Sequence, residues 1–364
     1  MVSASVPQIC DSFEHEALEL FRDPQSGLTG AIAIHSTALG PAMGGLRLRS
    51  YPSIEEAAID ALRLARAMTY KNAAAGLALG GGKAVVIDDG RWDEHRLERW
   101  DAFAQRLNRL EGRYITAEDV GTGPADMDRL ARGTRWVAGR SELGGGRGDP
   151  SSATAHTVFT AIRTAIAFRL AHLHPADVRV GVLGAGHVGG RLVDLLLDAG
   201  MSVDVADVNE AATERWAGHP RVARVGTEGF IARELDVLAP CAMGELVCVA
   251  DVPHLRCAIV AGAANNPLVD ELTAVALDER GILYVPDFLA NCGGIIHVGG
   301  EALGTSDLET HRLIDAAEHR LQRVLRRARE EDRVPVAIAR EEVETMLRGH
   351  RSRGAAPLSA LAPA

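Results

Sequence analysis

The sequence lacks the charge and the apolar runs that nucleic-acid-binding and membrane proteins need. Its 39 basic residues are outnumbered by 49 acidic residues, and the net charge of −10 has the wrong sign for nucleic acid or an anionic lipid surface. No apolar run is long enough to span a membrane, and the first residues lack the basic and apolar segments of a secretory signal. We therefore expect a cytoplasmic protein that acts on small molecules, with neither a nucleic-acid nor a membrane partner.

Cysteine is scarce as well. The five cysteines, an odd number, include no CxxC pair and none of the spacings that zinc sites use. They are Cys10, Cys241, Cys248, Cys257 and Cys292. We expect them to be reduced residues of the core or of an active site, and we expect no metal site.

Two domains are expected, because 364 residues exceed what one hydrophobic core usually serves. The stretch 144–152 is rich in Gly, Ser and Pro and is suited to a hinge. Apolar periodicity predicts strands that alternate with helices, which favours an α/β fold. The expected strands are 28–35, 43–49, 83–87, 113–117, 178–183, 202–206, 235–239, 258–261 and 282–285. The expected helices are 53–71, 93–110, 154–170, 191–198, 305–330 and 334–348.

The second half contains a dinucleotide-binding pattern. The glycine-rich sequence GxGxxG lies between a predicted strand and a predicted helix, in the order that such a βαβ unit requires. Gly184 is expected to make the tight turn, Gly186 to admit a pyrophosphate, and Gly189 to pack the helix on the sheet. The loop is completed by Ala185, His187 and Val188.

Asp207 indicates which dinucleotide is bound. It lies 18 residues after Gly189, at the end of the second predicted strand of this unit. A carboxylate there can accept hydrogen bonds from ribose hydroxyls and would repel a 2′-phosphate, and no arginine follows directly to hold one. NAD is therefore expected rather than NADP.

The first half has a lysine in an unusual place. Lys83 follows three glycines and precedes the apolar run 84–87, so we expect it at a strained turn beside a buried strand. Burial disfavours the charged ammonium and lowers its pKa, which is how enzymes obtain an amine base. Lys71, near the end of an amphipathic helix, and Asp119, before a glycine, add a cation and a carboxylate suited to binding and proton transfer. Each of the two alone would be an ordinary surface charge.

Several segments together resemble the leucine, valine and phenylalanine dehydrogenases of the glutamate dehydrogenase superfamily. The likeness extends from about residue 23 to 304, in the family's order. The segments are 34–45, 68–71, 79–83, 116–121, 239–244, 262–266 and 284–288. The resemblance implies an N-terminal α/β substrate and oligomerisation domain, comprising 1–149 and about 330–364, and a Rossmann-type NAD domain at 150–329. It also implies a homo-oligomer whose active site lies in the cleft between the domains.

The resemblance implies a role for each matching position. Lys71 would hold the substrate carboxylate beside Gly44 and Gly45, Lys83 would be the general base, and Asp119 its proton-transfer partner. Further cofactor or substrate contacts would come from Thr154, Ala239, Cys241, Asn265 and Asn266. The implied reaction is reversible oxidative deamination of an L-amino acid to a 2-oxo acid and ammonia, with hydride transfer to NAD.

The choice of amino acid rests on the side-chain pocket. By resemblance this pocket is lined by Met43, Met68, Ala117, Ile295 and Val298, all apolar. Their size favours valine, leucine and isoleucine, and one methylene is worth only about 1–3 kcal/mol in such a pocket. An aromatic amino acid dehydrogenase and a catalytically silent NAD-binding relative are the alternatives. Departures from the family pattern are Cys292, Glu245 with Leu246, and His187, while His297 could enter the pocket. These residues leave substrate choice open.

Overall fold

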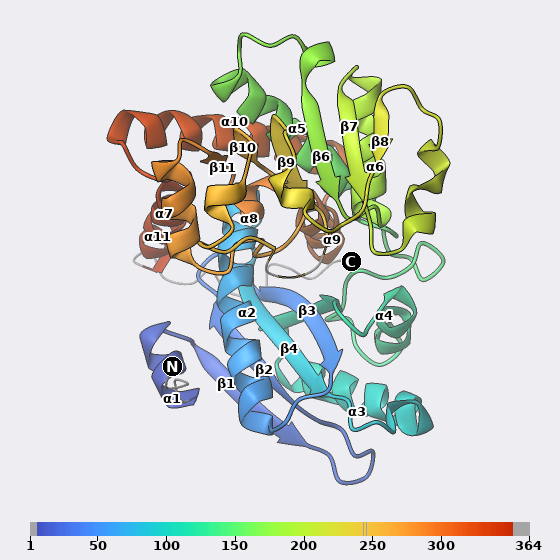
Figure 1. Ribbon diagram of the computed structural model, residues 1–364. Coiled ribbons are helices and arrows are strands. Elements are labelled where there is room, and N and C mark those ends of the chain that lie inside the picture. The colour runs from blue at the N-terminus through green and yellow to red at the C-terminus, as the bar shows by residue number, and fades with distance from the viewer. Residues whose placement is uncertain (1–5, 243, 245, 352–364) are drawn as a thin grey trace. The chain divides into compact units, whose positions relative to one another are not determined.

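A computed structural model describes residues 6–242, 244 and 246–351 (Figure 1). Met243 and Glu245 lie outside the described residues, and so does the C-terminal tail that was assigned to the first domain. The chain forms two compact units that divide between Asp149 and Pro150. The first unit also contains Ile295–Thr310 and the segment from Val343, and the second contains His311–Glu342. This differs from the expected division, which assigned all of 150–329 to the second domain.

The first unit is built on a five-stranded mixed sheet with the order β1-β2-β4-β3-β5. The three strands β4, β3 and β5 are mutually parallel, and β1 and β2 extend the sheet by antiparallel pairing. The strands are β1 (Ala17–Arg22), β2 (Thr29–Ser36), β3 (Ala42–Arg49), β4 (Gly80–Ile87) and β5 (Tyr114–Glu118). Strands β2, β3 and β5 lie within a residue or two of the predicted ranges, and β1 was not predicted.

Helix α2 (Ile54–Ala75) covers one face of this sheet. Its buried residues there are mostly alanine, and they pack against Ala31 and Ala33 of β2 and Val85 of β4. Small side chains let the helix approach closely, and a Cβ on Gly81 would collide with Thr69. One of the two hydrogen bonds of the predicted capping box is confirmed: the Glu56 N–H donates to Ser53 Oγ at 3.2 Å.

The other face of the first sheet carries an aromatic core. Trp92, Trp100, Phe103 and Tyr114 are buried there with aliphatic residues of β2 and β3. Two helices that supply part of this core are α3 (Arg96–Arg109) and α4 (Pro124–Ala131). The first sheet is thus covered on both faces, which places any polar residue inside it under strong constraint.

The second unit contains a six-stranded, wholly parallel sheet with the order β11-β10-β9-β6-β7-β8. Read from β8, this is the 3-2-1-4-5-6 order of dinucleotide-binding folds. The predicted Rossmann-type sheet is therefore confirmed. Its strands are β6 (Arg179–Leu183), β7 (Ser202–Ala206), β8 (Val222–Arg224), β9 (Val237–Pro240), β10 (Ile259–Val260) and β11 (Leu283–Tyr284).

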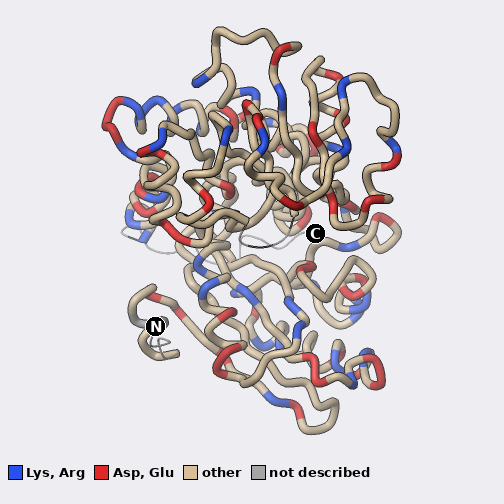
Figure 2. Tube along the Cα trace, in the orientation of Figure 1, with Lys and Arg blue, Asp and Glu red and all other residues tan. Residues whose placement is uncertain are grey.

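The remaining helices complete the chain. They are α1 (Val6–Ser12), α5 (Ser151–Arg169), α6 (His187–Asp198), α7 (Glu271–Glu279), α8 (Asp287–Ala290), α9 (Gly293–Leu303), α10 (Asp307–Glu331) and α11 (Pro335–Arg351). None of the helices within the described ranges is long and apolar enough to cross a membrane. Lys and Arg are interspersed with Asp and Glu through both units (Figure 2).

One local expectation was wrong. Lys83 does not lie at a strained turn, because β4 begins at Gly80 and Lys83 is the fourth residue of that strand. Gly80, Gly81 and Gly82 have no positive φ angle. They are instead required by close packing, since a Cβ on each would meet Ser36, Thr69 or Tyr114. The lysine therefore projects from the middle of a buried strand.

Candidate active site

The centre of the first unit is an ion pair between Lys83 and Asp119. Lys83 Nζ lies 2.8 Å from Asp119 Oδ2, and the side chains are 4% and 23% exposed. Asp119 directly follows β5, while β3 runs between β4 and β5. The two side chains therefore meet across the neighbouring strand, on the face of the sheet that α2 covers.

Gly45 of β3 leaves the space that this ion pair occupies. A Cβ at Gly45 would lie 2.7 Å from Asp119 Cβ and 3.1 Å from Lys83 Nζ. Any side chain there would push the pair apart. The sequence placed Gly45 beside Lys71 and the substrate carboxylate. In the structure its lack of a side chain lets Lys83 and Asp119 touch.

The surroundings of the pair adjust the pKa of both groups. Burial lowers the pKa of the Lys83 ammonium, although Asp119 acts in the opposite direction. Burial raises the pKa of Asp119, but the charges of Lys83 and Arg47 lower it by more, so the net shift is downward. The arrangement favours an ionised carboxylate beside an amine that loses its proton more readily than a lysine in water. Such an amine can act as a general base.

Lysine itself is rare in this protein. The full sequence contains 37 arginines and only two lysines, Lys71 and Lys83. An arginine stays protonated at any physiological pH, whereas a lysine can be deprotonated when it is buried. This compositional signal is present in the sequence and identifies the same two residues.

The predicted side-chain pocket lies within the first unit. Met68 packs on β3, because a Cβ at Gly44 would lie 3.0 Å from Met68 Cγ. Lys71 lies three residues after Met68 on α2 and is partly exposed. Val298 approaches Gly139 from α9. The exposed fractions of three predicted pocket residues are small: 0% for Met43, 6% for Ala117 and 7% for Val298.

In the second unit, the glycine-rich loop follows β6 and leads into α6. Gly184 has a φ of +102°, which only glycine adopts readily, and a Cβ there would press on the backbone after β9. A Cβ on Gly189 would collide with the carbonyl oxygen of Gly184. Gly186 differs, because its φ is −67° and its Cβ would point into open space. Protein packing therefore explains Gly184 and Gly189 but leaves Gly186 unexplained.

The loop is held by Asp207 and Cys241, both predicted to contact the cofactor. Asp207 Oδ2 accepts a hydrogen bond from the Ala185 N–H at 2.7 Å, and Oδ1 accepts one from Asn209 at 2.8 Å. The Cys241 N–H donates to the Leu183 carbonyl at 2.7 Å. Because the strand order reverses between β6 and β9, these residues lie at the switch point where parallel sheets bind ligands.

Comparisons with known proteins bear on the same residues. Residues 15–136 match the model of the Glu/Leu/Phe/Val dehydrogenase dimerisation domain, and residues 205–331 match that of the Glutamate/Leucine/Phenylalanine/Valine dehydrogenase domain. A leucine dehydrogenase of Thermoactinomyces intermedius is 39% identical over 94% of both chains. The chain belongs to the Glu/Leu/Phe/Val dehydrogenase family. It is therefore an amino acid dehydrogenase, an oxidoreductase that acts on CH–NH2 groups.

Other relatives of this amino acid dehydrogenase differ in the substrate that their names give. A valine dehydrogenase of Streptomyces virginiae is 45% identical over 81% of this chain and 83% of its own. The crystal structure of an L-tryptophan dehydrogenase from Nostoc punctiforme is 31% identical, with a TM-score of 0.82, and covers 94% of this chain and 98% of its own. The predicted family and reaction type are thus confirmed, and the predicted homology to branched-chain enzymes is confirmed with them.

The remaining predicted contacts of the dehydrogenase lie in its second unit, on a loop and on α5. Asn265 and Asn266 are exposed, and Asn266 has a φ of +48° with its N–H donating to Asp287 at 2.8 Å. Asn291 donates to Asn265 Oδ1 at 3.1 Å. Thr154, on the first turn of α5, donates to the Pro150 carbonyl at 3.0 Å. The strained backbone at Asn266 is the kind of feature that accompanies ligand sites.

His297, Cys292 and His187, which left the substrate choice open, have distinct surroundings. His297 Nε2 lies 3.0 Å from the Arg147 carbonyl, which supports a structural role. Cys292 is fully buried, and its Sγ lies 3.1 Å from the Leu289 carbonyl. His187 is exposed and begins α6. None of these contacts alters the reaction type.

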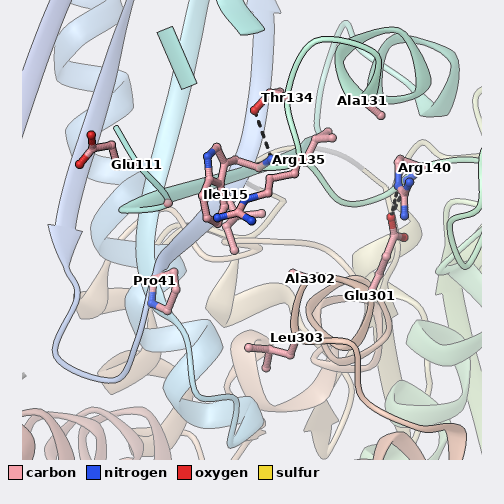
Figure 3. A pocket seen from close by; sticks show the side chains of 13 residues that line it. Pro41, Glu111, Ile115, Ala131, Thr134, Arg135, Arg140, Glu301, Ala302 and Leu303 are labelled. Atoms are coloured by element: carbon pink, nitrogen blue, oxygen red, sulfur yellow. Dashed lines mark hydrogen bonds and ion pairs between the residues drawn. The ribbon is translucent and has the colours of Figure 1, made fainter. Parts of the chain in front are cut away.

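A cavity of about 280 Å³ lies in the first unit between the start of β5 and α9 (Figure 3). Its wall includes Arg140 and Glu301, whose side chains form a 2.9 Å ion pair. The Glu301 side chain is 6% exposed and also accepts from the N–H groups of Gly139 and Arg147, each at 3.2 Å. Neither Lys83 nor Asp119 lines this cavity.

Sequence reasoning missed the residues behind Asp119. Arg47, Asp60 and Tyr51 form a polar network that reaches the carboxylate. Arg47 was expected only as a residue of the predicted strand 43–49. Its position two residues after Gly45 places it on the same face of β3, and this spacing was the available signal.

Proposed function

We propose that the protein catalyses the reversible, NAD-dependent oxidative deamination of a branched-chain L-amino acid to its 2-oxo acid and ammonia. The observation that carries the proposal is the buried Lys83–Asp119 pair in a member of the amino acid dehydrogenase family. A buried lysine needs a chemical reason, because desolvation of its charge costs free energy.

NAD is the dinucleotide that the second unit fits. Gly186 has room for a pyrophosphate over the N-terminus of α6, and the Asp207 carboxylate would repel a 2′-phosphate. The residues that would hold NAD are those of the loop with Asp207, Cys241, Ala239, Thr154 and Asn265. When bound, NAD accepts the hydride from the substrate Cα.

The residues of the chain perform the acid–base steps. Lys71 would hold the substrate carboxylate, with Gly44 and Gly45 nearby. Neutral Lys83 would take a proton from the water that adds to the substrate imine, and Asp119 would stabilise the resulting ammonium. Lys83 would then return this proton to the amino nitrogen of the carbinolamine. Neutral again, it would take the hydroxyl proton as the C–N bond breaks and ammonia departs, and Asp119 would assist these proton transfers. Asn266 would contact the substrate or the nicotinamide ribose.

The substrate assignment rests on the apolar pocket. Met43, Met68, Ala117, Ile295 and Val298 offer no cation for a distal carboxylate, so glutamate is disfavoured. A screen of NAD reduction with twenty L-amino acids tests this assignment. We expect the kcat/KM values for valine, leucine and isoleucine to lie within about 10- to 200-fold of one another, because one methylene contributes only about 1–3 kcal/mol.

Two outcomes of the screen would contradict the proposal. Preference for phenylalanine or tryptophan would favour an aromatic amino acid dehydrogenase, an alternative supported by the likeness to an L-tryptophan dehydrogenase. Absence of turnover with every amino acid would favour a catalytically silent NAD-binding protein.

The assembly and the compartment are part of the proposal. We propose a homo-oligomer, because residues 15–136 match a dimerisation domain. We also propose a cytoplasmic enzyme, in keeping with its five free cysteines. Light scattering on the purified protein would contradict the first point if it gave the mass of one chain.

A further inference from the structure

The Asp119 carboxylate is shared by two cations that approach the same oxygen. Lys83 Nζ and Arg47 Nε each lie 2.8 Å from Asp119 Oδ2. Arg47 comes from β3 and Lys83 from β4, so the two cations reach Asp119 from adjacent strands. A change in the interaction of one cation with this oxygen must therefore change the interaction of the other cation with it.

Arg47 is itself held from behind. Its Nη1 lies 3.0 Å from Asp60 Oδ2 on α2, and the Tyr51 hydroxyl donates to the same Asp60 oxygen at 2.5 Å. A continuous path of ionic and hydrogen bonds thus runs from Lys83 through Asp119 and Arg47 to Asp60. The planar guanidinium is suited to this position, because it can bond two carboxylates in fixed directions at once.

One end of this network, at Lys83, is shielded from water, and the other three side chains are more exposed. The side chains of Lys83, Arg47, Asp119 and Asp60 are 4%, 17%, 23% and 27% exposed. Partial burial strengthens the interaction of these charges relative to a surface pair. A base must spend part of each catalytic cycle neutral, and at that moment Asp119 would lose its lysine partner.

We propose that Arg47, held by Asp60, is a positioning residue that keeps Asp119 ionised and in place while Lys83 exchanges its proton. The inference rests on the proposed function, since it assigns Arg47 a part in the same acid–base chemistry. Arg47 touches neither the substrate nor the cofactor in this account. It acts through Asp119.

The charges that face Lys83 predict opposite effects for the two ends of the network. Burial lowers the pKa of Lys83 most, the positive charge of Arg47 lowers it further, and the negative charges of Asp119 and Asp60 raise it. Arg47→Met should therefore raise the pKa of Lys83. Asp60→Asn should lower it, because it removes a negative charge and leaves Arg47 less neutralised.

Two measurements test these effects. The first is the acidic limb of the kcat/KM profile for amino acid oxidation, which reports the pKa of the base in the free enzyme. We expect Arg47→Met to move this limb to higher pH and Asp60→Asn to lower pH, each by roughly one unit. Arg47→Lys should keep the limb near the wild-type position but lower kcat, because an ammonium cannot bridge both carboxylates.

The second measurement does not need turnover. Because the chain has only two lysines, NMR of lysine labelled with carbon-13 at Cε would show two side-chain signals, and Lys71→Arg would identify that of Lys83. The titration of this signal should shift upward in Arg47→Met and downward in Asp60→Asn. Arg49→Met, two residues along β3 at an exposed position, is the matched control and should shift neither measurement.

The outcomes separate the inference from the proposed function. The role of Arg47 would be overturned if Lys83 had the same pKa in wild type, Arg47→Met and Asp60→Asn. It would also be overturned if the pKa of Lys83 shifted in the same direction in both variants. If Arg47→Met fails to fold, Asp60→Asn is sufficient by itself: a Lys83 pKa that stays unchanged or rises in this variant would overturn the role of Arg47. Absence of turnover in the wild-type enzyme would overturn the proposed function, and the NMR titration would still decide the role of Arg47.

Discussion

At the scale of the residue, the choice between lysine and arginine follows the chemistry that a position needs. Exposed ion pairs of the described residues are formed by arginine, as in the pairs of Arg256 with Glu234 and of Arg327 with Glu341. Lysine is kept for Lys71 and Lys83. A cation that must lose its proton cannot be arginine, and this explains Lys83 more directly than Lys71.

Replacing Lys83 should therefore remove catalysis and spare cofactor binding. Lys83→Met keeps most of the side-chain volume and removes the amine, so we expect kcat to fall by about 10²–10⁴-fold, the usual contribution of a general base. The dissociation constant for NAD, measured by calorimetry, should stay at the wild-type value, because the glycine-rich loop belongs to the other unit.

Lys83→Arg provides the matched control for charge. It keeps the cation beside Asp119 but cannot supply a neutral base, so its turnover should also be lost. Substantial activity in Lys83→Arg would mean that Lys83 acts as a fixed charge. Loss of NAD binding in either variant would mean that the lysine is structural.

At the scale of the element, the glycine-rich loop separates residues needed for folding from a residue left free for a ligand. Gly189→Ala should destabilise the second unit, because the new Cβ would collide with Gly184. Gly186→Val should leave the unfolding temperature unchanged, because its φ is ordinary and its Cβ would lie in open space. The valine should nevertheless weaken NAD binding by about 10-fold or more, since it fills the place where the pyrophosphate is expected.

Gly186→Ala tests whether the effect is one of volume. The smaller side chain should weaken NAD binding less than valine does, in the same calorimetric titration. If valine leaves the dissociation constant unchanged, the pyrophosphate does not lie over Gly186. If it lowers the unfolding temperature as Gly189→Ala does, the distinction between the two glycines is wrong.

The sequence predicted elements best where apolar periodicity was regular. Strand β7 was predicted with its observed bounds, and α2 was found from its capping residues and alanines. Helix α9 was missed because four of its eleven residues are glycine, a poor helix former. Packing decides there instead, since a Cβ on Gly293 would collide with Ala153 and one on Gly299 would lie 2.7 Å from Leu77 Cδ1.

The sequence identified residues of the candidate site but not the contacts between them. Lys83 and Asp119 were identified, yet their contact depends on the strand order β4-β3-β5, which places Gly45 between them. The sequence does not state this order, because β3 precedes β4 in the chain by a whole helix. The same order brings Arg47 to Asp119, and for this reason Arg47 was missed.

At the scale of the whole molecule, the stability of the first unit depends on pH through groups outside the candidate site. The first unit contains a buried histidine, His35, beside a half-buried one, His15. His35 Nδ1 lies 2.8 Å from Thr69 Oγ1, and the rings of His15 and His35 are 4.9 Å apart. Arg66 adds a positive charge nearby, so protonation of either ring is opposed on two sides.

These histidines predict that the enzyme loses stability in weak acid. Burial, with the charges of His15 and Arg66, lowers the pKa of His35 from 6.5 to about 3. A histidine whose pKa is lower in the folded state favours the unfolded chain as the pH falls below 6.5, because the unfolded chain then binds the proton. The cost for His35 alone is about 1.4 kcal/mol at one pH unit below that value.

His35→Asn keeps a group that can bond Thr69 but cannot titrate, so its unfolding temperature should fall less than that of wild type between pH 7.5 and 5.5. The variant starts from a lower value because the smaller side chain leaves a cavity, and the comparison therefore uses the difference between the two pH values. An equal fall in both proteins would show that His35 does not carry the acid sensitivity of the first unit.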